Sequence, residues 1–471
     1  MSALQITTGV AYLVAAVGFV VGLHMMRTPS TARRGNLMSA SGMVLAVAAT
    51  LVDAISRNGS LAGWIVLLAG AVVGSAAGIL GARRVQMTSV PQLVSLFNAV
   101  GGGAAAAIAL ADLLHASPAH PIALSLSVPI VLDILIGSVT FSGSLIAAGK
   151  LQGIVASRSI RFPGSRAVNV IVALVAVVAA LATILFPVGV TTVLLLLVAA
   201  LGFGVLMVLP IGGADAPVVV SLLNAFTGLA VAMAGFVIGN LAMIIAGALV
   251  GAAGTILTLQ MAAAMNRSVA SIIIGGFAAA DTATSAQPST ETEDVRALSA
   301  DDVAIQLAYA QHVIIVPGYG LAAAQAQHAV AELASLLEQH GVDVKYAIHP
   351  VAGRMPGHMN VLLAEVNVPY DDLLQLDDAN RAFDTCDVAL VVGANDVTNP
   401  AARRPGNPVS GMPILDVDHA KAIVVLKRSM SPGYAGIPNE LFTDPKSGMF
   451  FADARQGLTQ IITAVKQYVT T

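Results

Sequence analysis

Nine apolar stretches of about 20 residues fill the first 266 positions, and they constrain the fold more than any other feature of the sequence. A stretch of this length crosses the roughly 30 Å hydrocarbon core of a bilayer as one helix. The sequence therefore predicts a membrane all-α bundle of about nine transmembrane helices. The predicted spans are residues 3–23, 36–55, 61–82, 89–110, 127–149, 167–186, 189–209, 215–237 and 240–262.

Basic residues gather on alternate loops between these spans. The loops after the first, third and fifth spans carry nine Lys or Arg residues, whereas the intervening loops carry only Arg57. Cytoplasmic loops of membrane proteins are enriched in Lys and Arg. We therefore expect the N-terminus outside the cell and the C-terminal region in the cytoplasm. The first span lacks a basic segment before it, so we expect an uncleaved anchor.

The charge distribution divides the chain into two parts. Residues 1–266 contain ten Lys or Arg, four Asp and no Glu, whereas residues 267–471 contain 13 Lys or Arg and 22 Asp or Glu. We predict a transmembrane domain at 1–266, an acidic linker at 267–302 and a soluble domain at 303–471. The net charge of −3 offers no basic surface for nucleic acid, and the single Cys386 excludes an internal disulfide or a cysteine metal cluster.

Spans four and eight repeat each other. Residues 91–99 and 217–225 share Pro, Val, Ser, Leu, Asn and Ala at matching positions. In each span, Ser, Asn and Gly recur at i, i+3 and i+7, which is one face of a helix. Helix packing explains such a face, and so does a path for ions or protons. Both interpretations stay open for Asn98 and Asn224, the asparagines of the two repeats.

Span five contains Asp133, which shares one helix face with Gly137, Thr140 and Ser144. A carboxylate inside a bilayer costs several kcal/mol and usually faces a bundle interior or water. Asp133 is therefore a candidate for a proton path, whereas Ser144 fits packing and a path equally well. Asp215, at the start of span eight, is either a helix N-cap or a gate.

Strands alternate with helices after residue 302, which predicts a soluble α/β Rossmann-like domain with a parallel sheet. The first strand, 313–316, leads into Gly318-Tyr319-Gly320-Leu321-Ala322-Ala323 and then a helical run to His340. Gly-x-Gly-x-x-Ala between a strand and a helix is typical of a dinucleotide phosphate site. Further strands are predicted at 342–348, 361–366, 388–392, 414–417 and 423–426.

Two strand ends bear on the choice of cofactor. The strand at 342–348 ends in His349-Pro350, where an NAD site usually places an acid for the ribose 2′-hydroxyl. The last predicted strand ends in Lys427-Arg428-Ser429, which suits a 2′-phosphate, although a surface charge pair is the alternative. Together these features favour NADP over NAD.

Three loops of the soluble half are candidates for binding. Residues 353–359 and 431–436 are rich in Gly and Pro, and the second loop places glycines around Tyr434, as a lid requires. Gly393-Ala394-Asn395-Asp396 ends a strand at the edge where open α/β sheets bind ligands. The sequence contains no apparent Ser/His/Asp triad or metal cluster, and its scattered histidines are interpreted as structural.

Several of these segments carry a family resemblance. The soluble half contains Pro-Gly-Tyr-Gly (317–320), Ala-Gly-Arg-Met-Pro-Gly-His-Met (352–359), Gly-Ala-Asn-Asp (393–396) and Lys-Arg-Ser-Met-Ser-Pro-Gly-Tyr-Ala-Gly (427–436). The membrane half contains Thr-Phe-Ser-Gly-Ser (140–144) and Gly-Ala-Asp-Ala-Pro (213–217). In these motifs, and over essentially its full length, the chain resembles the β subunit of proton-translocating NAD(P) transhydrogenase.

The resemblance implies hydride transfer between NADP(H) and NAD(H), coupled to proton passage across a bacterial inner membrane. NADP(H) would bind to this chain, and NAD(H) to a separate α subunit that also supplies further transmembrane helices. A dimer of αβ units in the lipid bilayer is expected. Hydride passes directly between two nicotinamide rings, so no side-chain nucleophile is required.

The resemblance also assigns residues. Lys427 and Arg428 would hold the 2′-phosphate, and Asp396 is a candidate for linking cofactor state to protonation. Asp453 would lie near the adenosine. The full implied cofactor site is Gly318, Tyr319, Gly320, Ala323, Ala352, Gly353, Arg354, Met355, Asn395, Asp396, Lys427, Arg428, Ser429, Gly433, Tyr434, Ala435 and Asp453.

In the membrane, Asn224, Ser144 and Asp215 match family positions that are linked to proton conduction. Asn98 departs from the family, because many relatives have a histidine at this position and Asn does not titrate near neutral pH. Either a partner subunit supplies a histidine, or Asp133 and water substitute for it. From a different class, a channel or transporter gated by a nucleotide-sensing domain would share the spans and the dinucleotide fold.

Overall fold

The computed structural model divides into two compact units, Met1–Ile211 with Val219–Thr258, and Gly212–Val218 with Leu259–Thr471. Arg354, Met355 and Tyr434 of the predicted site lie outside the residues that the structure describes. The described residues are 3–26, 29–56, 60–86, 89–115, 123–156, 160, 162–186, 189–212, 215–266, 268–270, 272–273, 295–353, 357–407, 409–433 and 435–469.

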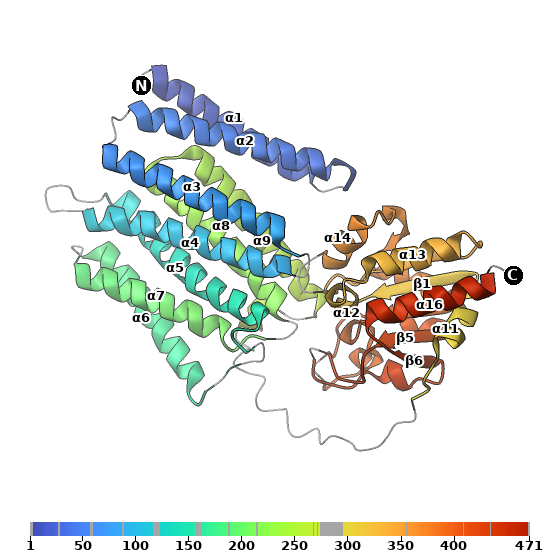
Figure 1. The fold of residues 1–471 in the computed structure, drawn as a ribbon. Helices are drawn as coiled ribbons and strands as arrows, with labels where there is room; N and C mark the ends of the chain where they lie inside the picture. The colour runs from blue at the N-terminus through green and yellow to red at the C-terminus, as the bar shows by residue number, and fades with distance from the viewer. Residues whose placement is uncertain are drawn as a thin grey trace. The chain divides into compact units, whose positions relative to one another are not determined.

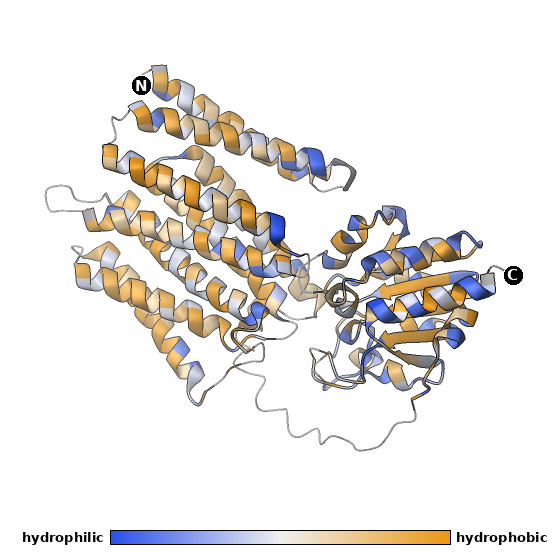
Figure 2. Cartoon of the chain, in the orientation of Figure 1, coloured by the Kyte–Doolittle hydropathy of each residue, from blue (hydrophilic) through white to orange (hydrophobic). Residues whose placement is uncertain are grey.

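Within the described ranges, nine helices are long and apolar enough to cross a membrane, as predicted (Figure 1). Hydrophobic residues lie on all sides of these helices, whereas helices of the second unit carry hydrophilic residues on one face (Figure 2). Helices that are apolar all round suit a lipid environment. The helices are α1 (Ala3–Met25), α2 (Pro29–Ser56), α3 (Leu61–Arg84), α4 (Val90–His115), α5 (Leu124–Gln152), α6 (Ser165–Leu185), α7 (Val190–Val208), α8 (Ala216–Ile238) and α9 (Leu241–Ala264).

The repeated glycines of α4 and α8 lie at close helix contacts. A Cβ atom added to Gly102 would lie 2.8 Å from Cβ of Thr140 and 3.0 Å from the carbonyl oxygen of Gly137, both on α5. A Cβ atom added to Gly228 would lie 2.3 Å from the backbone nitrogen of Gly251 on α9. Only glycine allows such an approach, so helix packing is confirmed as a role of these two residues.

The second unit contains one parallel sheet of six strands in the order β3-β2-β1-β4-β5-β6. Its strands are β1 (His312–Pro317), β2 (Asp343–Ala347), β3 (Leu373–Leu374), β4 (Val388–Val392), β5 (Ala422–Lys427) and β6 (Ser447–Phe451). Its helices are α11 (Ala300–Ala308), α12 (Tyr319–Ala323), α13 (Gln327–Glu338), α14 (His358–Glu365), α15 (Leu376–Phe383) and α16 (Ala454–Val469). The sheet confirms the predicted Rossmann-like fold class.

Alternate residues of the central strands face opposite sides of the sheet. Ile314, Ala389 and Ile423 belong to one core cluster, together with Phe383 of α15 and Phe442 of the 3₁₀ helix η7 (Glu440–Thr443). The other face lies beneath α11, α13 and α16, and α16 contacts both of the other helices (Figure 1). Both faces are therefore covered, as a parallel sheet requires.

Two predicted strands are wrong. The predicted strand at 361–366 is wrong because residues 361–365 belong to helix α14, whose buried Met359, Leu362 and Leu363 follow a helical period that a short apolar run conceals. The predicted strand at 414–417 is not formed, and the 3₁₀ helix η6 (Val417–His419) begins at its end. The helical run predicted after Ala323 is confirmed as α13, and Gln325, with a φ of 49°, lies between α12 and α13. Strands β3 and β6 were not predicted.

Candidate functional site

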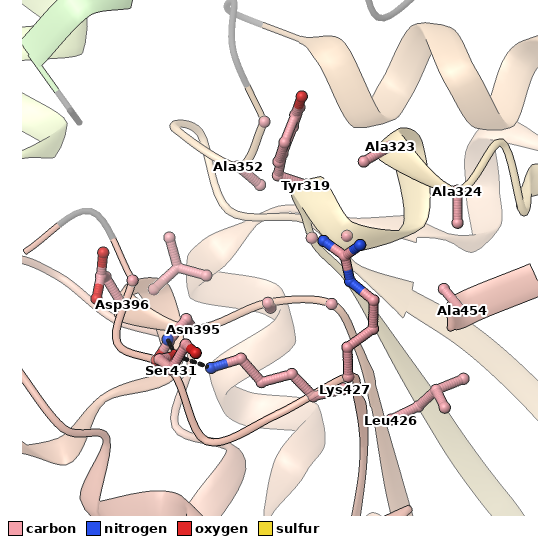
Figure 3. Close-up of a pocket in the computed structure, with 18 of the residues that line it drawn as sticks. Tyr319, Ala323, Ala324, Ala352, Asn395, Asp396, Leu426, Lys427, Ser431 and Ala454 are labelled. Carbon is pink, nitrogen blue, oxygen red and sulfur yellow. Dashed lines mark hydrogen bonds between the residues drawn. The ribbon is translucent and has the colours of Figure 1, made fainter. Parts of the chain in front are cut away.

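A cleft of about 760 Å³ lies where β1, β4 and β5 end. The strand order reverses between β1 and β4, and open α/β sheets bind ligands at such a switch point. In Figure 3, the side chain of Lys427 extends toward Asn395 and Ser431. The predicted residues that line this cleft are Gly318, Tyr319, Gly320, Ala323, Ala352, Gly353, Asn395, Asp396, Lys427, Arg428, Ser429, Gly433 and Asp453.

Three glycines bring the loops after β1 and β4 into contact at the base of the cleft. The backbone N–H groups of Gly318 and Gly320 donate to the carbonyls of Val392 and Gly393 at 2.9 and 3.0 Å. A Cβ atom on Gly318 would lie 2.3 Å from Cα of Ala394, and Gly393 has a left-handed φ of 67°. The sequence predicted that Gly318 and Gly320 admit a phosphate. The structure shows a further reason for them, which is backbone contact between two loops.

The two adjacent cations after β5 have different surroundings. Lys427 is half-buried, with Nζ 4.8 Å from the centre of the Phe442 ring and 2.5 Å from the carbonyl oxygen of Ser431. Burial lowers the pKa of Lys427, and the charge of Asp396 opposes that shift. Arg428 is exposed and lines the cleft. Neighbouring residues of a strand point in opposite directions, which accounts for the difference.

The loop after β4 contacts the segment that follows Lys427. Asp396 Oδ2 accepts a hydrogen bond from the N–H of Ala435 at 3.0 Å. A Cβ atom on Gly433 would lie 2.4 Å from Asp396 Oδ1, so a side chain there would displace the carboxylate of Asp396. The amide oxygen of Asn395, turned toward its donors, accepts from Lys427 Nζ at 2.9 Å and from the N–H of Gly433 at 2.7 Å. The predicted residues of both motifs are thus brought together.

The remaining predicted residues of the soluble half lie at the ends of elements. Gly353 has a φ of 102°, and a Cβ atom there would lie 2.6 Å from Nδ1 of His358. Asp453 directly precedes α16, and its Oδ1 accepts from the N–H of Arg455 at 3.1 Å. Asp453 therefore caps a helix as well as lining the cleft.

His349 follows β2, at the position where an NAD site usually has an acid. It is 1% exposed, its Nε2 donates to the carbonyl of Pro413 at 2.7 Å, and its Nδ1 accepts from the N–H of Val351 at 3.2 Å. Burial lowers the pKa of His349 to about 4, which keeps the ring neutral at neutral pH. Its contacts fix the loop that carries Ala352 and Gly353 to the cleft.

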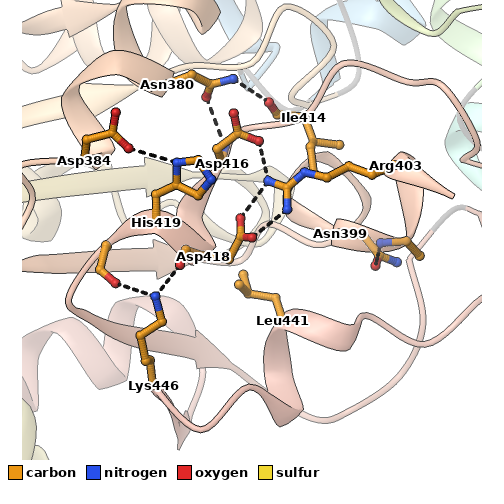
Figure 4. Close-up of polar contacts among 12 residues, drawn as sticks. Asn380, Asp384, Asn399, Arg403, Ile414, Asp416, Asp418, His419, Leu441 and Lys446 are labelled. Carbon is orange, nitrogen blue, oxygen red and sulfur yellow. Dashed lines mark hydrogen bonds and ion pairs between the residues drawn. The ribbon is translucent and has the colours of Figure 1, made fainter.

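An ion cluster that the sequence analysis missed lies beside the loop after β4 (Figure 4). Arg403 donates to both carboxylate oxygens of Asp418, at 2.6 and 2.9 Å, and to Asp416 at 2.5 Å. Burial raises the pKa of Asp418, but its hydrogen bonds and attraction to Arg403 outweigh burial and lower that pKa overall. A bidentate pair of this kind fixes geometry, so the cluster holds the loop in place.

In the membrane unit, the candidates fall into two groups. Gly143, next to Ser144 on α5, packs against Leu223, next to Asn224 on α8. On α4, the carbonyl of Asn98 accepts from Oγ1 of Thr227, one turn after Asn224, at 3.4 Å. Ser144, Asn224 and Asn98 thus come from three helices at one depth.

Asp133 lies apart from these three residues. It precedes Ser144 by 11 positions on α5, about 16 Å along the helix axis. It is fully buried, and its neighbours Ile130, Val131 and Ile134 belong to an apolar cluster. Asp215 directly precedes α8. The structure therefore does not gather all the membrane candidates at one place.

Comparison with known proteins covers both units. The family model described as NAD(P) transhydrogenase beta subunit matches residues 8–464. Two relatives named NAD(P) transhydrogenase subunit beta, both from Rhodospirillum rubrum, are each 46% identical over 464 residues. Each match covers 97% of this chain and 99% of the relative. On this evidence, the chain belongs to the NAD(P) transhydrogenase beta subunit family.

Proposed function

We propose that this chain is the NADP(H)-binding, membrane-spanning β subunit of a proton-translocating transhydrogenase. Hydride transfer between NADP(H) and NAD(H) would be coupled to proton translocation. The observation that carries the proposal is the cleft at the switch point of the sheet, with Arg428 on its lining and neutral His349, not an acid, after β2. This arrangement suits a ribose that carries a 2′-phosphate.

The cleft fits this cofactor in size and in chemistry. Its volume of about 760 Å³ is within the ~300–1,000 Å³ that is typical of small-molecule and cofactor sites. Arg428 and Ser429 supply donors for a phosphate, and Lys427 adds positive charge at the base. The bound cofactor supplies the hydride, while residues of this chain bind it, orient it and exclude water.

We further propose that this chain acts with an α subunit. The α subunit would carry the NAD(H)-binding domain and further transmembrane helices, and two αβ units would form a dimer. The excess of Lys and Arg on alternate loops supports an N-terminus outside the bacterial inner membrane and a cytoplasmic nucleotide domain. Residues 1–266, 267–302 and 303–471 would be the transmembrane domain, linker and nucleotide domain.

Asn98, Asp133, Ser144, Asp215 and Asn224 are the proposed proton path. Coupling requires that protonation in the membrane alters the affinity for NADP⁺ relative to NADPH, and linkage makes this effect reciprocal. The depth shared by Asn98, Ser144 and Asn224 supports a common path through three helices. Burial of Asp133 in an apolar cluster supports a specific role, because a buried carboxylate is costly.

The test uses membranes that contain this chain and its α subunit. Reduction of an NAD⁺ analogue by NADPH is followed while a pH gradient is imposed and then collapsed. The proposal expects hydride transfer whose rate changes when the gradient is collapsed. A rate that ignores the gradient would exclude coupling, and proton flux that NADPH gates without hydride transfer would support a nucleotide-gated channel.

A further inference from the structure

Two buried asparagines join the loop after β4 to the segment after Lys427. Asn399 is 0% exposed and Asn439 is 4% exposed. Each directly precedes a short 3₁₀ helix, η5 (Pro400–Arg403) and η7 respectively. Both lie outside the motifs of the family resemblance, and neither lines the cleft. A hydrogen bond of Asn439 nevertheless ends on Asn395, which does.

Asn399 uses both ends of its side-chain amide. Its oxygen accepts from the N–H of Ala401 at 3.1 Å, which caps η5. Its nitrogen donates to the carbonyl of Pro438 at 3.0 Å, 39 residues away in the sequence. The first bond is local, whereas the second crosses to the other segment.

Asn439 repeats this arrangement from the opposite side. Its oxygen accepts from the N–H of Leu441 at 3.0 Å, which caps η7. Its nitrogen donates to the carbonyl of Asn395 at 3.0 Å and approaches Oγ1 of Thr398 at 3.3 Å. Asn395 lines the cleft, so the second crossing bond ends at the site itself.

The choice of residue shows that the crossing bonds matter. Asp, Ser or Thr would serve as caps of these short helices, because a cap requires only an acceptor oxygen. Asn alone combines that acceptor with amide donors in a side chain of this size. At both positions the side-chain amide lies between a backbone N–H and a backbone carbonyl. The amide oxygen accepts from the N–H, and the amide nitrogen donates to the carbonyl.

We propose that Asn399 and Asn439 are positioning residues for the bound dinucleotide. They hold residues 435–439 against the turn at 395–399, and so fix Asn395, Asp396 and Gly433 at the wall of the cleft. The inference rests on the proposed binding of NADP(H) in this cleft. Without the crossing bonds, the wall would be ordered only when the cofactor binds, and binding would bear that entropic cost.

Asn439→Asp and Asn399→Asp test this inference, because each keeps the capping oxygen and removes the donors. In Asn439→Asp, a carboxylate would face the carbonyl of Asn395. We expect both variants of the full-length chain to bind NADPH roughly tenfold more weakly, mostly through faster release. NADPH fluorescence gives the affinity, and a stopped-flow chase with excess NADP⁺ gives the release rate.

Asn380→Asp is the matched control. Asn380 of α15 also uses both amide ends, donating to the carbonyl of Ile414 at 2.9 Å and accepting from the N–H of Asp416 at 3.0 Å (Figure 4). It does not line the cleft. The same substitution there should lower thermal stability by a similar amount and leave the NADPH release rate within about twofold of wild type.

A pH profile separates positioning from a general loss of stability. In Asn439→Asp, the new carboxyl group gains one O–H when it is protonated, and this O–H can donate to the carbonyl of Asn395. The ratio of the Asn439→Asp release rate to the wild-type rate should therefore fall as the pH decreases from 8 to 5.5. If Asn439→Asp does not fold, Asn439→Ser keeps a neutral capping oxygen and lacks the crossing donors.

Wild-type release rates in the folded Asn399 and Asn439 variants would overturn the inference, as would an equal effect of Asn380→Asp. A wild-type chain that does not prefer NADPH to NADH would instead contradict the proposed function. The two failures are distinguishable, because one is measured on the variants and the other on the unaltered chain.

Discussion

Two asparagines with 4% of their surface exposed, one in each half of the chain, differ in how their buried amides are partnered. In the second unit, the nitrogen of Asn439 donates across the candidate site and its oxygen caps η7. In the membrane half, Nδ2 of Asn98 has no hydrogen-bond partner among the described residues. A buried polar group without a partner costs free energy, so such a group suggests a purpose other than stability.

The contrast extends to neighbouring groups. Both carboxylate oxygens of Asp133 and the hydroxyls of Ser138 and Ser144 are buried without a partner in the described part of the membrane half. Loose packing does not explain them, because Gly102 of α4 meets the backbone of α5 closely. Hydrogen bonds thus join the loops at the wall of the cleft, whereas three residues of the proposed proton path have buried polar atoms without a partner among the described residues.

The largest effect is expected from Asp133→Asn, which removes a titratable group without changing its size. If Asp133 and water carry the proton, coupled turnover in proteoliposomes with the α subunit should fall by roughly 100-fold or more. NADPH binding should stay unchanged. Exposed Asp112, at the end of α4, provides the control variant Asp112→Asn. Full turnover by Asp133→Asn would assign the titratable role to a residue of the partner subunit.

Arg428→Met should produce the next largest effect. Arg428 is exposed on the cleft, and loss of its charge-assisted hydrogen bonds to a 2′-phosphate should weaken NADPH binding by about 2–3 kcal/mol. NADH binding should not change. Lys427→Met should weaken both cofactors more evenly, because Lys427 also contacts the wall at Ser431. Isothermal titration with both nucleotides measures the two affinities, and an equal loss for NADPH and NADH in Arg428→Met would contradict this role.

The two asparagines allow a direct test of the comparison between the halves. Asn399→Ala leaves the Pro438 carbonyl and the Ala401 N–H without their partner and should cost about 2–3 kcal/mol of unfolding free energy. Asn98→Ala removes an amide nitrogen that has no partner and should cost less than about 1 kcal/mol. Thermal unfolding in detergent measures both. Equal costs would mean that the amide of Asn98 is partnered after all.

The sequence predicted those parts of the fold whose signals are local. The nine spans follow from length and hydropathy, and β1, β2, β4 and β5 from short apolar runs. Strand β6 was missed because Ser447 and Gly448 interrupt its apolar pattern. The structure explains Gly448, since a Cβ atom there would lie 2.3 Å from the side chain of Leu298.

The site was predictable only where its residues share a motif. Gly318, Asn395 and Arg428 lie in recognisable segments, and the structure places them on one cleft. The residues that support them were missed because their partners lie far away in the sequence. Asn439 bonds to a residue 44 positions earlier, and Asn399 to one 39 positions later. Periodicity and motif spacing contain no information about such pairs.

His349 should produce the smallest effect, and one that depends on pH. Its pKa is about 4 in the folded chain and about 6.5 when unfolded. Between these values the unfolded state binds more protons, so stability decreases as the pH falls. From pH 7 to 5.5 we expect a loss of about 1 kcal/mol. His349→Gln should reduce this loss, and exposed His340→Gln should not.

Pulse proteolysis of the full-length chain at both pH values measures the loss of stability. An unchanged loss in His349→Gln would show that His349 gains a proton without unfolding, and that burial does not keep the ring neutral.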